Sequence, residues 1–196
     1  MQLKYGGRTL LERALGAVAD ARRVAVVGPR RAGDSQARMP ERVVEVVYVS
    51  EVVTHGGPAA AIAAGFGALD LADGDRAEWI IVLPADLICP EAAAALLYDA
   101  ALHASALVDA VVGERAGHAQ HLAVAYRPVA LEGAIARWGG EFGLAGRPAR
   151  VLHEPLRKLF LNLPAGACVD IDSPDDALAH GLHLPPAAST ELEPVI

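Results

Sequence analysis

The segment WIIVLPAD, residues Trp79 to Asp86, decides the fold. Its unbroken apolar run, ended by Pro84, is typical of a strand that is buried on both faces of a sheet. Two shorter runs rich in β-branched residues precede it, RVAVVG from Arg23 and VVEVVYV from Val43. Segments with the spacing of amphipathic helices lie between these runs. This alternation predicts a mainly parallel sheet that is covered by helices on both faces.

The rest of the chain continues the alternation. The connection between the strands expected at 109–114 and 121–127 is too short for a crossover helix, so this pair is expected to be antiparallel. From about residue 184 the sequence has no periodicity, which predicts one domain over residues 1–183 and a mobile tail over 184–196. Helices are expected from Thr9, from Pro58, and over 90–103, 129–138 and 148–160, and strands over 23–28, 43–49, 79–86, 109–114, 121–127 and 167–172.

The composition is that of a folded globular protein. The 196 residues are 53% hydrophobic and 21% charged, and the net charge of −7 argues against a nucleic-acid-binding face. No apolar stretch reaches the roughly 18–20 residues that span a bilayer, so no membrane association is expected. Cys89 and Cys168 lie in apolar runs, which favours small buried thiols in a reducing cytoplasm over a disulfide.

A glycine-rich turn opens the helix that follows the strand at 43–49. Gly56 and Gly57 precede Pro58 at the first helical position, an arrangement whose backbone N–H groups suit a phosphate or the edge of a base. The same residues are also ordinary punctuation between a strand and a helix, and the turn taken alone favours that interpretation.

Three aspartates stand at the ends of expected strands, where open α/β sheets bind ligands. Asp86 directly follows the most hydrophobic strand and is well placed to hold Mg²⁺, with a turn aspartate before Pro90 as an equal alternative. Asp170 and Asp172 alternate along the last strand and therefore project to one face. Because two such carboxylates repel each other unless a cation lies between them, the pattern indicates a metal site.

Other chemistry finds little support. The pairs His118–His121 and His180–His183 have spacings that metal sites use, but neither has a third ligand nearby, so we expect solvated histidines. The sequence contains no G-x-S-x-G elbow, no G-x-x-x-x-G-K-[ST] loop and no C-x-x-C pair, which leaves hydrolase, Walker-type ATPase and redox functions without support.

Taken in order, five segments between Lys4 and about Ala179 resemble the MobA-like nucleotidyltransferases, the family of molybdenum cofactor guanylyltransferase and its cytidylyltransferase relatives. The resemblance implies a three-layer α/β/α, Rossmann-like fold whose mostly parallel sheet has one antiparallel strand. The segments are GGRTLLERAL from Gly6, GGPAAAIAAG from Gly56, LPADLICP from Leu83, HLAVAYRPVAL from His121 and VDIDSPDDAL from Val169.

By this resemblance the protein would transfer GMP from GTP, or CMP from CTP, to the terminal phosphate of molybdopterin and release pyrophosphate. A phosphate oxygen of the acceptor attacks the α-phosphorus, so catalysis consists of positioning and charge neutralisation. The resemblance assigns Mg²⁺ to Asp86, with Asp172 and Asp170 completing its ligands. It assigns the base and ribose to Gly57, Pro58, Ala59 and Ala60.

The sequence also departs from the family. The family begins with a strand and a Gly-rich loop that wraps the triphosphate, and this sequence starts after that segment, so we expect the first strand, internal to the parallel sheet, to be missing. Ala61 replaces a frequent glycine of the family, and Asp170 and Asp172 replace asparagines. The replacement of the asparagines weakens the guanylyl assignment.

Three interpretations therefore stay open. The first is an active nucleotidyltransferase whose Gly-rich loop is encoded upstream. The second is a non-catalytic partner or scaffold protein, in which pairing into a homodimer covers the open sheet edge. The third is a transferase that acts on a sugar phosphate or a polyol phosphate.

Overall fold

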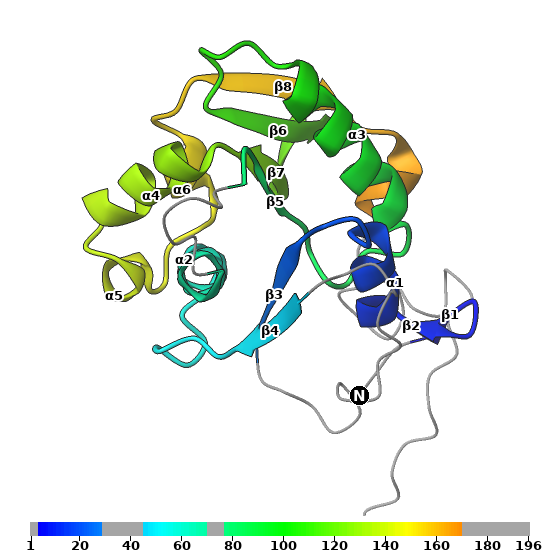
Figure 1. Cartoon of the computed structure of the whole chain (residues 1–196), viewed down its shortest axis with the longest axis horizontal. Helices are drawn as coiled ribbons and strands as arrows, with labels where there is room; N and C mark the ends of the chain where they lie inside the picture. Colours follow the sequence, from blue (N-terminus) through cyan, green and yellow to red (C-terminus); the bar gives the residue numbers. More distant parts are fainter. Residues whose placement is uncertain (1–3, 29–44, 70–76, 170–196) are drawn as a thin grey trace, which may run out of the picture.

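The computed structural model describes residues 4–28, 45–69 and 77–169, in which helices and strands alternate as expected (Figure 1). The helices are α1 (Leu10–Ala17), α2 (Pro58–Ala68), α3 (Pro90–His103), α4 (Pro128–Arg137), α5 (Glu141–Leu144) and α6 (Arg150–His153), with the 3₁₀ turn η2 (Ala165–Cys168). The strands are β1 (Lys4–Tyr5), β2 (Arg8–Thr9), β3 (Arg23–Val27), β4 (Glu45–Val49), β5 (Ile80–Val82), β6 (Ala110–Arg115), β7 (His118–Tyr126) and β8 (Lys158–Asn162).

The largest sheet has the strand order β5-β7-β6-β8. Strand β6 runs parallel to β8, whereas β7 runs antiparallel to both β5 and β6. Strands β3 and β4 form a separate parallel pair, and β1 and β2 form a short hairpin. The α/β fold with one antiparallel strand in a mostly parallel sheet is therefore confirmed.

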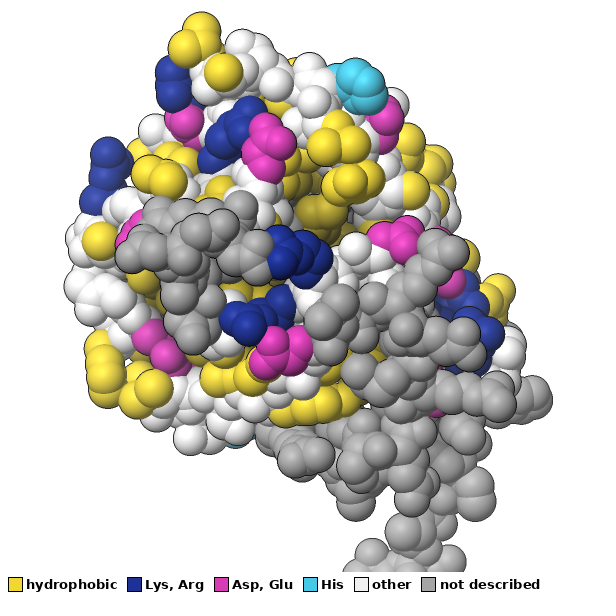
Figure 2. Space-filling model, in the orientation of Figure 1, with side chains coloured by type: hydrophobic (Ala, Val, Ile, Leu, Met, Phe, Trp, Pro, Cys, Tyr) yellow, Lys and Arg dark blue, Asp and Glu magenta, His cyan; other side chains and the backbone are white. Residues whose placement is uncertain are grey.

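Strands β3 and β5 belong to separate sheets in the described part of the chain. Within the described ranges, no strand pairs with β3 on the side away from β4, or with β5 on the side away from β7. Figure 2 shows a hollow near the middle of this face, with hydrophobic side chains at its floor. Strand β5 was expected to be buried on both faces, but its residues are only half-buried. Within the described ranges β5 lies at the edge of its sheet, and an apolar strand at such an edge keeps part of its surface in contact with solvent.

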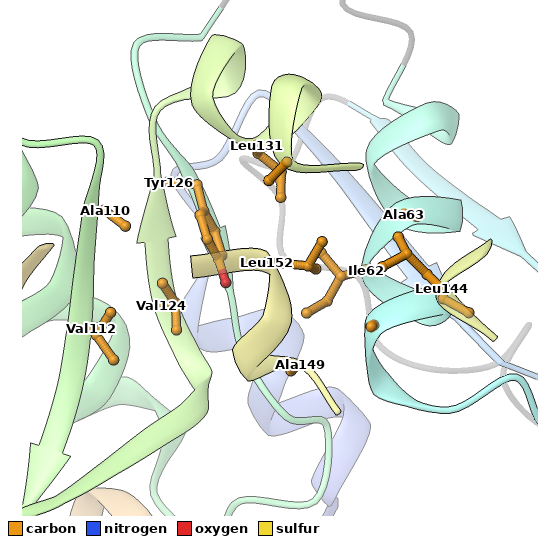
Figure 3. Packing of buried hydrophobic residues seen from close by; sticks show 13 residues of the cluster. Ile62, Ala63, Ala110, Val112, Val124, Tyr126, Leu131, Leu144, Ala149 and Leu152 are labelled. Carbon is orange, nitrogen blue, oxygen red and sulfur yellow. The ribbon is translucent and has the colours of Figure 1, made fainter. Parts of the chain in front are cut away.

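Two hydrophobic clusters lie on opposite faces of the four-stranded sheet. One fills the space between the sheet and α2, α4 and α6, and the other packs beneath α3 and η2. Figure 3 shows Val124 and Tyr126 of β7 facing the helices that carry Leu131 and Leu152. Helices on both faces of a sheet make the three layers that the sequence predicted.

Helix α1 begins where the sequence predicted. The Thr9 hydroxyl accepts a hydrogen bond from the Glu12 backbone N–H at 3.1 Å, and the Thr9 N–H donates to the Glu12 carboxylate at 2.8 Å. This reciprocal capping box pairs two backbone N–H groups that a helix start otherwise leaves without a hydrogen-bond acceptor.

Replacing Thr9 with alanine removes the side-chain acceptor of this cap. We expect the Thr9→Ala variant to lose about 1 kcal/mol of unfolding free energy, as measured by urea denaturation. A Thr9→Ser variant keeps the acceptor oxygen and should lie within a few tenths of a kcal/mol of the wild type. Equal losses in both variants would contradict the role of the cap.

Near the end of the described chain, the second half of one predicted helix was wrong, and the first residues of a predicted strand form a turn instead. The helix predicted over 148–160 ends at His153, and Lys158–Asn162 form strand β8 instead. Pro155 has no N–H to continue the helix, and Arg157 pairs with Asp109 through two hydrogen bonds of 2.9 Å, which aligns β8 with β6. The strand predicted over 167–172 begins as the 3₁₀ turn η2, in which Ala167 N–H bonds Pro164 O at 2.9 Å.

The rest of that predicted strand and the boundary at 183/184 lie outside the described residues. No helix within the three described ranges is long and apolar enough to cross a membrane.

Candidate functional site

Asp86 lies in the turn that connects the carboxyl end of β5 to the start of α3. Its carboxylate oxygen Oδ1 is buried, although the residue as a whole is half-buried. The two residues that follow, Leu87 and Ile88, are only 4% and 5% exposed, so the turn is anchored in the protein. A carboxylate at a strand end offers the oxygen ligands that a hard cation prefers.

Contacts from α1 and from Val169 fix this turn. Arg13 Nε donates to the Ile88 carbonyl oxygen at 2.7 Å, and its guanidinium pairs with Glu91 at 3.0 Å. On the other side, the Ile88 N–H donates to the Val169 carbonyl oxygen at 2.9 Å. Cys89, which the sequence placed among buried thiols, is a half-buried free cysteine in the same small cluster.

Val169 immediately precedes Asp170 in the chain. The structure therefore holds the residue before the predicted aspartate pair against the turn that carries Asp86. Asp170 and Asp172 themselves lie outside the described residues. Among the residues that are described, no group of three or more His, Cys, Asp or Glu side chains is arranged to hold a metal ion.

The predicted nucleotide turn forms the start of α2, beyond the carboxyl end of β4. Gly57 has a φ of 84°, a left-handed conformation that favours glycine, and Pro58 occupies the first helical turn. Ala59 and Ala60 are 0% exposed, so their side chains belong to the core. The backbone around Gly57 and Pro58 is therefore the accessible part of this turn.

A loop that sequence reasoning missed, residues 145–148, lies over the start of α2. The Gly146 N–H donates to the Gly56 carbonyl oxygen at 2.7 Å, and the Ala59 N–H donates to the Arg147 carbonyl oxygen at 3.4 Å. The Arg147 guanidinium lies 3.8 Å from the centre of the Trp138 ring, and its Nε donates to the Gly143 carbonyl oxygen at 2.9 Å. The Ala59 N–H is therefore already hydrogen-bonded to this loop, although the sequence analysis expected the N–H groups at this helix start to be available to a ligand.

A second feature missed by the sequence is a hydrogen-bonded chain behind this loop. The Tyr126 hydroxyl lies 3.0 Å from His153 Nδ1, and His153 Nε2 lies 3.0 Å from His121 Nδ1. His121 is exposed, as expected, but one of its ring nitrogens is also held from inside the protein. No sequence signal joins these residues, since His121 and His153 are 32 positions apart and meet only through packing.

Burial keeps His153 neutral. The side chain is 3% exposed, and its desolvation, with the nearby His121 and Lys158, lowers the pKa of His153 to about 4 from an ordinary 6.5. Burial also raises the pKa of Tyr126 well above its ordinary value. Both groups therefore take part in the hydrogen-bonded chain in their neutral forms near pH 7.

These properties predict acid-sensitive stability. Between pH 6.5 and about 4 the unfolded chain binds a proton at His153 that the folded chain does not, so the unfolding free energy falls as the pH falls through this window. We expect a loss of about 2–3 kcal/mol, measured by urea unfolding at several pH values. The His153→Gln variant, which hydrogen-bonds without titrating, should lose less stability over this window. An unchanged pH profile in that variant would contradict the assignment.

Comparisons with known proteins complete the description of the site. A protein from a Mycobacterium species, described as a homolog of Mycobacterium tuberculosis Rv0371c, superposes with a TM-score of 0.61 at 20% identity, covering 91% of this chain and 84% of that one. The 2-C-methyl-D-erythritol 4-phosphate cytidylyltransferase of Thermus thermophilus gives 0.60 at 19% identity, covering 90% and 89%. Rv0371c of Mycobacterium tuberculosis in complex with manganese gives 0.58 at 21% identity, covering 91% and 89%.

These structural likenesses, at such low identity, show the shared fold. No curated protein matches the sequence significantly. The amino-acid sequence itself matches a family description over residues 1–158, a span that includes α1, the start of α2, the Asp86 turn and the hydrogen-bonded chain. Over this span the chain belongs to the family of the MobA-like NTP transferase domain, a family of nucleotidyltransferases.

Proposed function

We propose that this protein transfers a nucleoside monophosphate from GTP or CTP to the terminal phosphate of molybdopterin, with Asp86 as the residue that holds a divalent cation. The observation that carries this proposal is the Asp86 turn, with its buried Oδ1 and its hydrogen bond from Ile88 to Val169. Asp170 is the next residue in the chain after Val169, which accepts the hydrogen bond from Ile88. This supports Asp170 and Asp172 as further ligands of the same cation.

A bound Mg²⁺ or Mn²⁺ ion would neutralise charge on the triphosphate, which an acidic protein of net charge −7 otherwise repels. The carboxylate donors of Asp86, Asp170 and Asp172 suit either ion, because both prefer oxygen ligands. The mycobacterial protein in complex with manganese supports a divalent cation for this fold. The role of the chain's own residues is to hold the reacting phosphates in line, since the transition state needs positioning and charge stabilisation.

The start of α2 is the proposed seat of the base and ribose. Gly57 and Pro58 present accessible backbone there, whereas Ala59 and Ala60 keep the helix start free of bulky side chains. The loop of residues 145–148 lies beside this turn and is held there by its hydrogen bonds with Gly56 and Ala59. A planar base bound along this backbone would be recognised by N–H and C=O groups rather than by side chains.

A sugar phosphate or polyol phosphate is the second candidate acceptor. One structural neighbour is named as a cytidylyltransferase of 2-C-methyl-D-erythritol 4-phosphate, which is a polyol phosphate. Both acceptor classes offer the same nucleophile, a phosphate monoester oxygen that attacks the α-phosphorus. The two functions therefore differ in acceptor recognition and share the chemistry at Asp86.

The test is a matrix of reactions that crosses GTP and CTP with molybdopterin and with a panel of sugar and polyol phosphates. Pyrophosphate release and the mass of the product would be measured for each pair, with Mg²⁺ or Mn²⁺ present. We expect a product whose mass equals the acceptor plus one nucleoside monophosphate, formed with molybdopterin. A product only with a polyol phosphate would replace the acceptor assignment, and no product with any pair would favour the non-catalytic partner or scaffold role.

A further inference from the structure

We propose that the chain Tyr126–His153–His121 is an acid-sensitive latch that holds the loop of residues 145–148 against the start of α2. The latch regulates access to the turn that carries Gly57 and Pro58. This proposal rests on the proposed function only where it treats that turn as the nucleotide-binding site. The contacts between the latch, the loop and α2 stand independently of any activity.

Neutral rings complete the latch in one arrangement. Tyr126 is fully buried, so its O–H is best satisfied by donating to His153 Nδ1 at 3.0 Å. His153 Nε2–H then donates to His121 Nδ1 at 3.0 Å, which leaves the second N–H of the exposed His121 to solvent. Each of the two hydrogen bonds then contains one proton, and every ring nitrogen or hydroxyl that faces another has one donor and one acceptor.

A proton added to His153 breaks this arrangement. Both ring nitrogens then donate, so the Tyr126 hydroxyl must accept and turn its own hydrogen elsewhere inside the core. An unmatched donor at a fully buried site is costly, as is a charge on a side chain that is 3% exposed. Protonation is therefore coupled to a state in which His153 reaches water.

The charges around His153 strengthen this coupling. Strand β8 brings Lys158, whose ammonium group donates to the carbonyl oxygens of His153, Glu154 and Leu156 at 2.8–3.2 Å. Strand β7 brings His121 and Tyr126, α6 carries Arg150, and Glu154 directly follows α6. The α2 segment carries no titratable side chain, and the charged residues of α4, Glu132 and Arg137, are exposed. The lysine and the second histidine both disfavour a further positive charge on His153.

Helix α6 transmits the change to the loop. It is a single turn, Arg150–His153, that directly follows the loop, and its Leu152 is fully buried in the core against α2 and α4. If His153 moves to water, Leu152 leaves the core with it and the loop loses its anchor. The bonds from Gly146 to Gly56 and from Ala59 to Arg147 then open.

Amide hydrogen exchange tests the latch without any assay of activity. The protection of the Gly146 N–H would be measured by NMR at pH 7 and pH 5, corrected for the intrinsic pH dependence of exchange, with the Val124 N–H in β7 as the reference for global unfolding. We expect Gly146 to be less protected than Val124 at both pH values, and to lose about 20-fold of its protection at pH 5. Equal protection of the two amides, or no change with pH at Gly146, would overturn the proposal.

Variants separate the latch from other acid effects. His153→Gln keeps hydrogen-bonding groups but has no titration in this range, so Gly146 protection should become independent of pH. The matched control is His103→Gln on the surface of α3, a histidine with 77% side-chain exposure, which should keep the wild-type pH dependence. If both variants behave alike, the latch is not His153. The wild-type comparison with Val124 decides the matter if His153→Gln does not fold.

The same exchange experiment with added nucleotide separates the latch proposal from the proposed nucleotidyltransferase function. Saturating GTP or CTP should raise Gly146 protection at pH 5, because a ligand at the start of α2 stabilises the closed loop. An acid-sensitive Gly146 that no nucleotide protects would leave the latch standing and count against the proposed nucleotide seat. An acid-insensitive Gly146 that nucleotide protects would support the seat and overturn the latch.

Discussion

The Asp86→Asn variant is expected to lose at least about 100-fold of the nucleotidyl transfer rate, because the amide removes the negative charge that holds the cation against the triphosphate. The substitution keeps the size and shape of the side chain, so the turn held by Arg13 and Val169 should remain folded. Pyrophosphate release with the preferred nucleotide and acceptor measures the rate. Thermal unfolding checks that the variant is as stable as the wild type.

A matched control is Asp99→Asn on α3. Asp99 is an acidic residue of the same kind with 73% side-chain exposure, and it forms an exposed ion pair with His103 one helical turn away. Its variant should retain the wild-type rate within about twofold, because exposed pairs contribute little. Equal rates for the two variants, or an Asp86→Asn enzyme at full speed, would remove Asp86 from the reaction.

Gly143→Ala is expected to destabilise the fold by about 3 kcal/mol or more, or to prevent folding, because overpacking against rigid backbone cannot be relieved by a side-chain rotation. A Cβ atom added at Gly143 would overlap the Trp138 carbonyl oxygen and would lie 2.7 Å from its carbonyl carbon. The backbone between α4 and α5 would have to move, and with it the residues that support Arg147. Urea unfolding monitored by circular dichroism measures the loss.

Gly133 provides the matched control for this prediction. It lies within α4, and a Cβ atom added there meets nothing within 4 Å. Gly133→Ala should therefore leave the stability unchanged or raise it by about 0.5–1 kcal/mol, since alanine is the better helix former. A wild-type stability for Gly143→Ala would contradict the described path of the chain from Trp138 to Gly143.

Local signals in the sequence were sufficient for most elements of the fold. The Thr9 cap, Pro58 and Pro90 marked three helix starts, because capping and proline geometry act within one turn. The short connection after β6 predicted the antiparallel strand β7. These features depend on neighbours in the sequence, which is why one sequence was enough.

The prediction for the segment that forms β8 was wrong because this strand depends on contacts with residues far away in the sequence. A short apolar segment such as KLFLN at Lys158–Asn162 is compatible with a helix or a strand, and only its pairing with β6 decides between them. The latch and the loop over α2 are also products of packing. His153 meets Tyr126 and His121, and Gly146 meets Gly56, across long stretches of chain.

The candidate site was predictable only in part. Asp86 was proposed from its place after a hydrophobic strand, and the structure adds its buried Oδ1 and the hydrogen bond from Ile88, in the same turn, to Val169. Residues 57–60 were proposed from a glycine-proline turn, but no local pattern showed that the Arg147 carbonyl oxygen accepts a hydrogen bond from the Ala59 N–H. The predicted ligands Asp170 and Asp172 remain predictions.

Binding of Mn²⁺ in the presence of a non-hydrolysable GTP or CTP analogue tests the central claim most directly. The measurement is a titration followed by electron paramagnetic resonance, on the wild type and on Asp86→Asn with Asp99→Asn beside them. The account predicts a nucleotide-dependent Mn²⁺ site in the wild type and in Asp99→Asn, with affinity weakened at least about 10-fold in Asp86→Asn, as loss of a charged ligand requires. Mn²⁺ binding of equal strength in all three proteins, or no nucleotide-dependent site in the wild type, would contradict it.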